Sequence, residues 1–191
     1  MPAENRGRVL RAAAESFMRH GYQASIDQIA RRAGVAKQTV YHHFASKDAL
    51  FKQVAHELTR AVLVELGAEP RELRAALVRF ALAYRERALG AQGLATFRTV
   101  LPEVPRFRAL ARTMYAAGAG EMVRQLAAYL ERAMQAGELR RDDPQFAAEL
   151  LLGMLAGHDR IKRLFGVERP NGPDDARSRQ IVECFLRAYQ P

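Results

Sequence analysis

The chain has few groups that could form a covalent cross-link and no segment suited to a membrane. Its 191 residues contain one cysteine, Cys184, which excludes an intramolecular disulfide and a metal site built from cysteines. No apolar run approaches the roughly 18 residues of a membrane span, and no signal-peptide core follows Met1. We therefore expect a cytoplasmic protein that makes no membrane contact.

The residue patterns of catalysis are also missing. No Ser/His/Asp arrangement is evident, no glycine-rich phosphate loop follows a strand, and Cys184 falls on the apolar face of the last expected helix. The adjacent His42 and His43 would point about 100° apart on a helix, and no acidic or thiol ligand is spaced to join them. We predict no enzyme activity, no cofactor and no metal site.

Strand patterns are absent as well, because the apolar residues recur at helical spacing between glycine and proline breaks. The fold class predicted is all-α, with three helices in an N-terminal domain over 1–50 and six in a body over 51–191. The nine expected helices cover approximately 5–20, 26–33, 36–44, 47–66, 70–89, 97–101, 106–136, 144–166 and 174–190.

The charge of the chain is unbalanced toward one end. The formal net charge is +9, and residues 1–53 carry nine Lys and Arg against four Asp and Glu. An Arg-rich solvated surface would explain this, but a basic N-terminal domain also fits an anionic partner such as nucleic acid.

Residues 25–44, SIDQIARRAGVAKQTVYHHF, predict two short helices joined by a glycine turn. Ser25 and Gln28 form a capping box that starts the first helix at Ile26. Gly34 can end that helix, because the residue after a helix commonly takes a positive φ.

The second of these helices has an apolar side and a polar side. Its inward positions, four residues apart, are Ala36, Val40 and Phe44. Its outer side is left with Lys37, Gln38, Thr39, Tyr41 and His42, which suit phosphates and base edges. This is a helix-turn-helix, and we expect its second helix to enter a DNA major groove.

Each candidate DNA contact has a specific chemistry. Gln38 can pair with adenine and His42 can donate to guanine, whereas Lys37 and Thr39 can reach a base edge or a phosphate. Phosphate contacts are expected from Tyr41, Ser25 and Lys47, the last two at helix starts. For Lys37, Thr39 and Tyr41 the alternative is plain surface decoration, and for Ser25 capping alone is an adequate explanation.

These residues resemble the N-terminal DNA-binding domain of the TetR family of bacterial transcriptional regulators. The resemblance covers 6–51 and rests on Val9-Leu10, Ala13, Phe17, Gly21-Tyr22, Ile29-Ala30, Ala33-Gly34-Val35, Lys37, Thr39-Val40-Tyr41, His43-Phe44, Ser46-Lys47 and Leu50-Phe51. Ala36 departs from it, because Ser or Thr is common there and would cap the second helix.

The body resembles the AefR-type C-terminal domain found in many TetR-family proteins. The matching residues are Phe97-Arg98, Pro105-Arg106-Phe107, Gly137-Glu138-Leu139, Asp143, Ala147-Ala148 and Leu151-Leu152-Gly153-Met154. The resemblance implies two functions for the body, dimerisation and the binding of a small effector.

An apolar effector pocket is expected mainly between the helices at 70–89, 97–101 and 106–136, with parts of 144–166. Its candidate lining residues, for each of which ordinary core is the alternative, are Phe80, Tyr84, Phe97, Met114, Tyr115, Met122, Met154 and His158. The predicted effector is a hydrophobic or amphipathic small molecule.

Gly153 and Gly157, four residues apart on the penultimate helix, permit close approach of another helix. We predict that they mark the crossing point of a homodimer interface formed by the last two helices. A contact within one subunit is the alternative.

The sequence thus predicts a homodimeric, ligand-responsive transcriptional regulator, a repressor that binds a palindromic double-stranded operator. Its half-sites would lie about one helical turn apart, ~34–36 Å, and the effector would tilt the linking helix at 47–66. The alternatives are an architectural DNA-binding protein without an effector, which the polar Gln38 and Thr39 disfavour, and a catalytic body fused to a DNA-binding domain.

Overall fold

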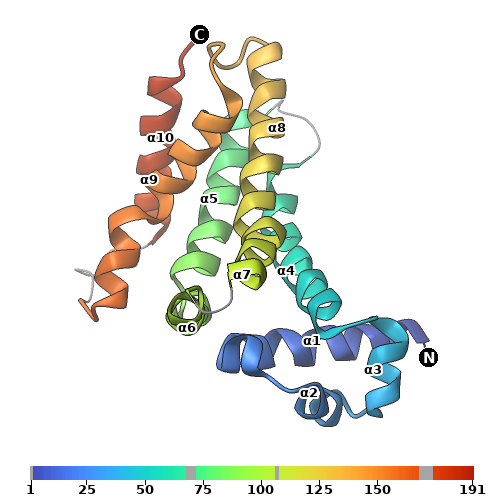
Figure 1. Ribbon diagram of the computed structural model, residues 1–191. Coiled ribbons are helices and arrows are strands. Elements are labelled where there is room, and N and C mark those ends of the chain that lie inside the picture. The colour runs from blue at the N-terminus through green and yellow to red at the C-terminus, as the bar shows by residue number, and fades with distance from the viewer. Residues whose placement is uncertain (1, 68–71, 106–107, 168–173) are drawn as a thin grey trace. The chain divides into compact units, whose positions relative to one another are not determined.

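The computed structural model describes residues 2–67, 72–105, 108–167 and 174–191, and every regular element within these ranges is helical. The α-helices are α1 (Pro2–His20), α2 (Ile26–Ala33), α3 (Lys37–His43), α4 (Lys47–Leu63), α5 (Leu73–Leu89), α6 (Ala91–Val100), α7 (Arg108–Tyr115), α8 (Glu121–Gln135), α9 (Pro144–Leu164) and α10 (Asp174–Ala188). Figure 1 shows their order along the chain. The all-α prediction is confirmed.

One predicted helix, at 106–136, contains a change of helix type in the structure. A π-helical turn over Ala116–Gly120 joins α7 to α8 without a break, so the three form one continuous helical stretch. Gly118 and Gly120 lie in this turn, where the absence of side chains allows the wider winding. Counted this way, the nine predicted helices are all present in the described part of the chain.

Local signals set several helix ends, and the sequence predicts Asp143-Pro144 and Ser46 as helix starts and Gly137 as a helix stop. Asp143 accepts a hydrogen bond from the backbone of Gln145 at 2.9 Å, and Pro144 takes the first helical position of α9. Ser46 accepts from the backbone of Ala49 at 3.0 Å at the start of α4. Gly137, with φ 76°, ends the stretch that contains α8. The sequence also predicts a helix start at Pro70 and a loop over the PNGPDD segment at 170–175, but Pro70 and most of that segment lie outside the described residues.

The chain divides into two compact units, Met1–Leu58 with Ala91–Gly118, and Thr59–Gly90 with Ala119–Pro191. In unit 1, α1 packs against α2, and α6 packs against α1 and the 3₁₀ turn at Gly21–Gln23. The core of its N-terminal part is built on Val9, Ala13, Phe17, Ile29, Val40 and Leu50. Helix α4 begins in unit 1 and ends in unit 2, and the division predicted at residue 50 stays a prediction.

Unit 2 is a bundle in which α9 packs against α8 and α5, and α10 packs against α5. Its apolar core draws on every one of these helices, and its fully buried side chains include Leu77, Phe80, Leu126, Tyr129, Leu151 and Phe185. Helices packed this way bury one face each and leave the other face outside.

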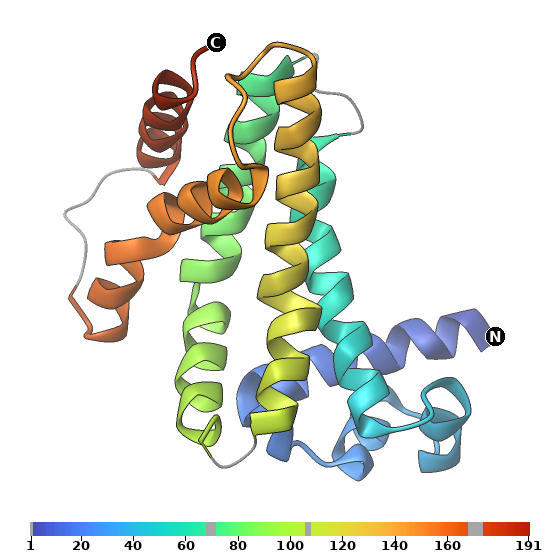
Figure 2. The same ribbon diagram turned by 45° about the horizontal axis from the view of Figure 1, so that its top comes forward.

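Helix α9 changes direction at Gly157, whose φ of 3° and ψ of −113° are not helical, and Figure 2 shows the helix in two segments. Arg85 on α5 lies beside this bend with 0% of its side chain exposed. It donates to the carbonyl of Leu155 and, at 3.0 Å, to the carboxylate of Asp159. The guanidinium therefore binds α9 on both sides of the bend.

Arg163 forms a second link between α5 and the distal segment of α9. It donates to the carbonyl of Leu89, the last residue of α5, at 2.8 Å. The segment after Gly157 is thus held to α5 by polar contacts at two places.

Within the described residues, no helix has the length and apolarity that crossing a membrane requires.

The buried ion pair yields a stability prediction. Asp159→Ala leaves a fully buried guanidinium without its carboxylate, which should lower the free energy of unfolding by about 3–5 kcal/mol. Urea denaturation followed by circular dichroism measures this loss.

Glu183→Ala is the matched control, because Glu183 pairs with Arg74 on the surface and both side chains are well exposed. Exposed pairs contribute about 0–1 kcal/mol, so this variant should unfold close to the wild-type midpoint. Equal losses in the two variants would contradict the structural role given to Arg85 and Asp159.

Candidate nucleic-acid interface

The helix-turn-helix begins with the capping box that the sequence predicts. The Ser25 hydroxyl accepts from the backbone of Gln28 at 3.1 Å, and the Gln28 side chain accepts from the backbone of Ser25 at 3.3 Å. These reciprocal bonds satisfy two donors at the N-terminus of α2. Ser25 therefore has a structural role, and its predicted phosphate contact stays a prediction.

The turn after α2 is a Schellman motif centred on Gly34. Gly34 has φ 64° and ψ 39°, and its N–H donates to the carbonyl of Arg31 at 3.1 Å. The next residue, Val35, donates to the carbonyl of Ala30 at 3.0 Å. This pair of bonds closes α2 and sets the direction in which α3 leaves.

Helix α3 is anchored by Val40 and Phe44, which are buried in the core of the N-terminal part as predicted. The inward placement of Ala36 is wrong. Ala36 is exposed and serves as the N-cap, with the extended dihedrals φ −70° and ψ 152°. The helical period starts only at Lys37, so it does not extend to Ala36. No side chain caps α3, as the missing hydroxyl implies.

The outer face of α3 carries the predicted polar group of side chains. Those that are exposed are Lys37, Gln38, Tyr41 and His42, with Tyr41 at 46%, whereas Thr39 is half-buried. Lys37 lies 3.1 Å from the carboxylate of Asp27 on α2, in an exposed ion pair. Such a pair is weak in water, so a phosphate can compete with Asp27 for the ammonium group.

Lys47, the first residue of α4, is held by a neighbouring aromatic ring. Its Nζ lies 4.3 Å from the centre of the Tyr22 ring, and the Tyr22 hydroxyl donates to Asp48. Burial, followed by the hydrogen bond and the charge of Asp48, raises the pKa of Tyr22 to about 12, so the phenol stays a donor at neutral pH. Burial lowers the pKa of Lys47, and the charge of Asp48 opposes that shift.

The sequence interpretation gave no role in the interface to Tyr22 or Asp27, and it used Asp48 only as an acidic residue that favours the start of α4. Tyr22 orients Lys47 by a cation–π contact, Asp48 accepts from the Tyr22 hydroxyl, and Asp27 pairs with Lys37 on α3. Tyr22 occurs in the motif that suggested the fold, but its partners are 25 and more residues away, and spacing alone does not reveal them.

The residues predicted to bind an effector are divided between the two units. In unit 2, Phe80 and Met122 belong to the buried core, and Tyr84 and Met154 pack against it. The rings of Phe80 and Tyr84 stack with their centres 5.9 Å apart. His158 is exposed on α9. In unit 1, Phe97 and Met114 are half-buried, and Tyr115 is 62% exposed.

His42 and His43 are adjacent on α3 with ring centres 5.3 Å apart. Among the described residues, no group of three or more His, Cys, Asp or Glu side chains is arranged to hold a metal ion. A basic and polar helix face over a packed core can bind phosphates and base edges, which is the chemistry of DNA recognition.

Two protein families match the chain, one in each part. Residues 9–54 match "Bacterial regulatory proteins, tetR family", and residues 75–191 match "AefR-like transcriptional repressor, C-terminal domain". Together they cover the helix-turn-helix and most of the remaining helices.

Individual proteins give the same result. Over 52 residues, 27% of this chain and 24% of the relative, the sequence is 50% identical to the HTH-type transcriptional activator FasR of Mycolicibacterium smegmatis. It is 28% identical to the A-factor receptor protein of Streptomyces griseus over 93% of this chain and 59% of that one. The chain therefore spans less than two thirds of these relatives. The solved structure of the flavonoid-responsive regulator FrrA is 30% identical, covers 99% of this chain and 98% of its own, and has a TM-score of 0.72.

The position of Lys47 yields a prediction about salt. Lys47→Ala should weaken binding to all duplex sequences and reduce the slope of log K against log salt concentration by about 0.9, because one phosphate contact is lost. The slope can be measured by fluorescence anisotropy with a labelled duplex, at salt concentrations from about 50 to 200 mM.

Lys52→Ala is the control, since Lys52 is exposed on α4 five residues later and carries the same charge. Its slope should stay closer to that of the wild-type protein. If Lys47→Ala and Lys52→Ala give the same slope, Lys47 has no specific contact with a phosphate.

Proposed function

Because the chain belongs to the TetR family of bacterial transcriptional regulators, we propose that it is a homodimeric repressor that leaves a palindromic operator when a hydrophobic small molecule binds. It is a DNA-binding transcriptional regulator and its relatives are not enzymes. A protein that reads DNA in a bacterium works in the cytoplasm, and we propose that compartment. The observation that carries the proposal is the exposed polar face of α3, followed in the chain by Lys47, whose ammonium group lies over the Tyr22 ring.

In this proposal the base edges are read from α3 and the phosphates are bound from its flanks. Gln38 and His42 are the base-reading candidates because both are exposed and can donate hydrogen bonds. Lys37, Thr39 and Tyr41 contact a base edge or the backbone, and Ser25 and Lys47 contact phosphates.

The dimer is proposed to form on an apolar face of α9 that nothing in the described chain covers. Phe146 is 54% exposed and aligns at helical spacing with the exposed Leu150, Gly153 and Gly157, and beyond the bend Ile161 is 52% exposed. Large exposed apolar patches usually mark an interaction surface.

The two glycines argue for a contact between subunits. A Cβ built on Gly153 or Gly157 would have no described atom within 4 Å, so neither glycine is needed for a close approach inside the subunit. The other proposed half of the interface, α10, offers the polar Arg177, Gln180 and Arg187, which suit the rim of an interface.

A hydrophobic effector is supported by the nature of the body and by its relatives. FrrA is named as flavonoid-responsive and the relative from S. griseus as the receptor for A-factor. The half-buried Tyr84 and Met154 offer an aromatic face and an adaptable thioether beside the core. A repressor is favoured by the description of the C-terminal family, whereas FasR, an activator, matches only over 52 residues.

Two helices could carry the signal. The linking helix α4 runs from unit 1 into unit 2, and α6 packs against α1, whose buried face supports the helix-turn-helix. An effector that displaces either helix alters the spacing of the two recognition helices. It must bind the DNA-incompetent state more tightly than the competent state, or it shifts nothing.

A regulator without an effector is the second candidate, favoured by the basic charge of residues 1–53. The neutral readers Gln38 and Thr39 argue against purely architectural binding, which phosphate contacts alone would satisfy.

The proposed interface can be tested with Gly153→Leu. The new side chain has open space within its own subunit, so the fold should persist, but it should hold the partner's helix away and favour monomers. Sedimentation equilibrium measures the change. Ala61→Leu, at an exposed position of α4, should remain as dimeric as the wild-type protein. A dimeric Gly153→Leu protein would place the interface elsewhere.

The proposed effector can be tested with a panel of flavonoids and short acyl compounds. A true effector should raise the melting temperature of the free protein and should weaken DNA binding. At a compound concentration of 100 times its dissociation constant, binding adds about 2.7 kcal/mol to the free energy of unfolding. Met154→Ala should reduce the thermal shift and leave DNA affinity without compound unchanged. If no compound in a broad apolar library alters either quantity, the protein is a regulator without such an effector.

A further inference from the structure

A groove on unit 1 is lined by far more positive than negative charge. It has a volume of about 390 Å³ and lies between α1 and the C-terminal end of α2. Its charged lining consists of four arginines and one glutamate, Arg8, Arg11, Arg31, Arg32 and Glu15. Four guanidinium groups around one groove repel one another, and this repulsion is relieved when an anion binds.

Two of the arginines are already held by the protein. Arg32 forms an ion pair of 2.6 Å with Glu15, which joins α2 to α1. Arg8 donates to the carbonyl of Gly34 at 3.3 Å, so its guanidinium lies across the turn between α2 and α3. A Cβ at Gly34 would come within 2.4 Å of Arg8 Nη2, and the glycine therefore also makes room for this arrangement.

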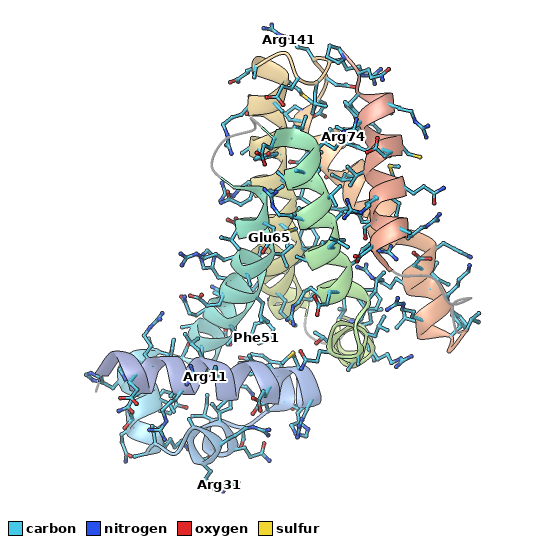
Figure 3. The ribbon with its side chains drawn as sticks, turned by 180° about the vertical axis from the view of Figure 1, so that it is seen from behind. Arg11, Arg31, Phe51, Glu65, Arg74 and Arg141 are labelled. Carbon is cyan, nitrogen blue, oxygen red and sulfur yellow. The ribbon has the colours of Figure 1, made fainter. Side chains whose placement is uncertain are left out.

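The other two arginines have their charge available. Arg11 and Arg31 are exposed, and neither makes a side-chain hydrogen bond or ion pair with the described part of the chain. Figure 3 shows these side chains on α1 and α2. The planar fork of a guanidinium matches a phosphate through two parallel hydrogen bonds. The groove thus combines one oriented donor, Arg8, with two uncommitted ones.

We propose that this groove is a phosphate-binding site for the DNA backbone, outside the contacts made by α3 and the start of α4. The inference rests on the DNA-binding function of the same unit. DNA is favoured as the occupant because the groove borders the turn that leads into α3, so the site and the reading helix belong to one packed body. The contact carries no base information and adds affinity for any sequence.

The test compares two single-charge variants on a duplex of mixed sequence, so that no operator needs to be known. Arg31→Ala should reduce the slope of log K against log salt concentration by about 0.9. Between 50 and 200 mM salt the variant should therefore lose about threefold less of its DNA affinity than the wild-type protein. Arg19→Ala is the matched control, because Arg19 is an exposed arginine of α1 outside the groove. Its slope should stay near the wild-type value.

The double variant Arg11→Ala/Arg31→Ala should show about twice the slope change of Arg31→Ala if both arginines bind phosphates. Unchanged melting temperatures would show that neither substitution disturbs the fold. Equal slopes for Arg31→Ala and Arg19→Ala would overturn the proposal while leaving the DNA-binding function intact. A wild-type protein that binds no duplex at all would instead refute that function.

Melting temperatures measured with and without inorganic phosphate test whether the groove binds a small anion. If phosphate raises the melting temperature of the wild-type protein but not of the double variant, and the DNA slopes of the two proteins are equal, the groove binds a small anion and not DNA. If the DNA slopes of the two proteins are equal and phosphate changes neither melting temperature, the occupant of the groove would instead be an acidic protein surface. Either result would overturn the proposal.

Discussion

The turn at Gly34 is the constraint on which the DNA-binding part of this protein depends. Its positive φ closes α2 through bonds from Gly34 and Val35, and it starts α3 in the direction that places Val40 and Phe44 in the core. With those two side chains buried, the opposite side of α3 must face solvent. A larger residue at 34 would strain the backbone and also displace Arg8 from the turn. The same glycine therefore orients the reading helix and shapes the basic groove.

The C-terminal helices meet a different physical requirement. Arg85 and Asp159 form a buried pair that costs desolvation and is weak evidence for stability as such. Its position beside the bend at Gly157 suggests what it contributes: it fixes the distal segment of α9 against α5. The apolar outer face of α9 includes both glycines and the exposed Phe146 and Ile161. A fixed bend gives that face a defined shape, which a self-complementary interface needs.

Local features were predictable from the sequence, and long-range polar pairs were not. The capping box at Ser25, the stop at Gly34 and the Asp143-Pro144 start of α9 each involve residues within a few positions of one another. Arg85 is separated from Asp159 by 74 residues, and Arg8 from Gly34 by 26, so neither contact has a signal in spacing. Ala36 shows the limit of periodicity. The repeat of apolar residues at positions 36, 40 and 44 includes Ala36, which lies one residue before the start of α3. Charge alone likewise could not show which arginines share a groove.

The central claim is that α3 reads a specific sequence in two symmetric copies, and sequencing the DNA selected by the purified protein tests it most directly. The wild-type protein should enrich two inverted half-sites with centres about one helical turn apart, ~34–36 Å. Gln38→Ala should relax the preference at one position in each half-site, since an amide pairing worth about 1–3 kcal/mol of discrimination is lost. Enrichment of no common sequence, or a Gln38→Ala protein that selects the same sites as the wild type, would contradict this role for α3.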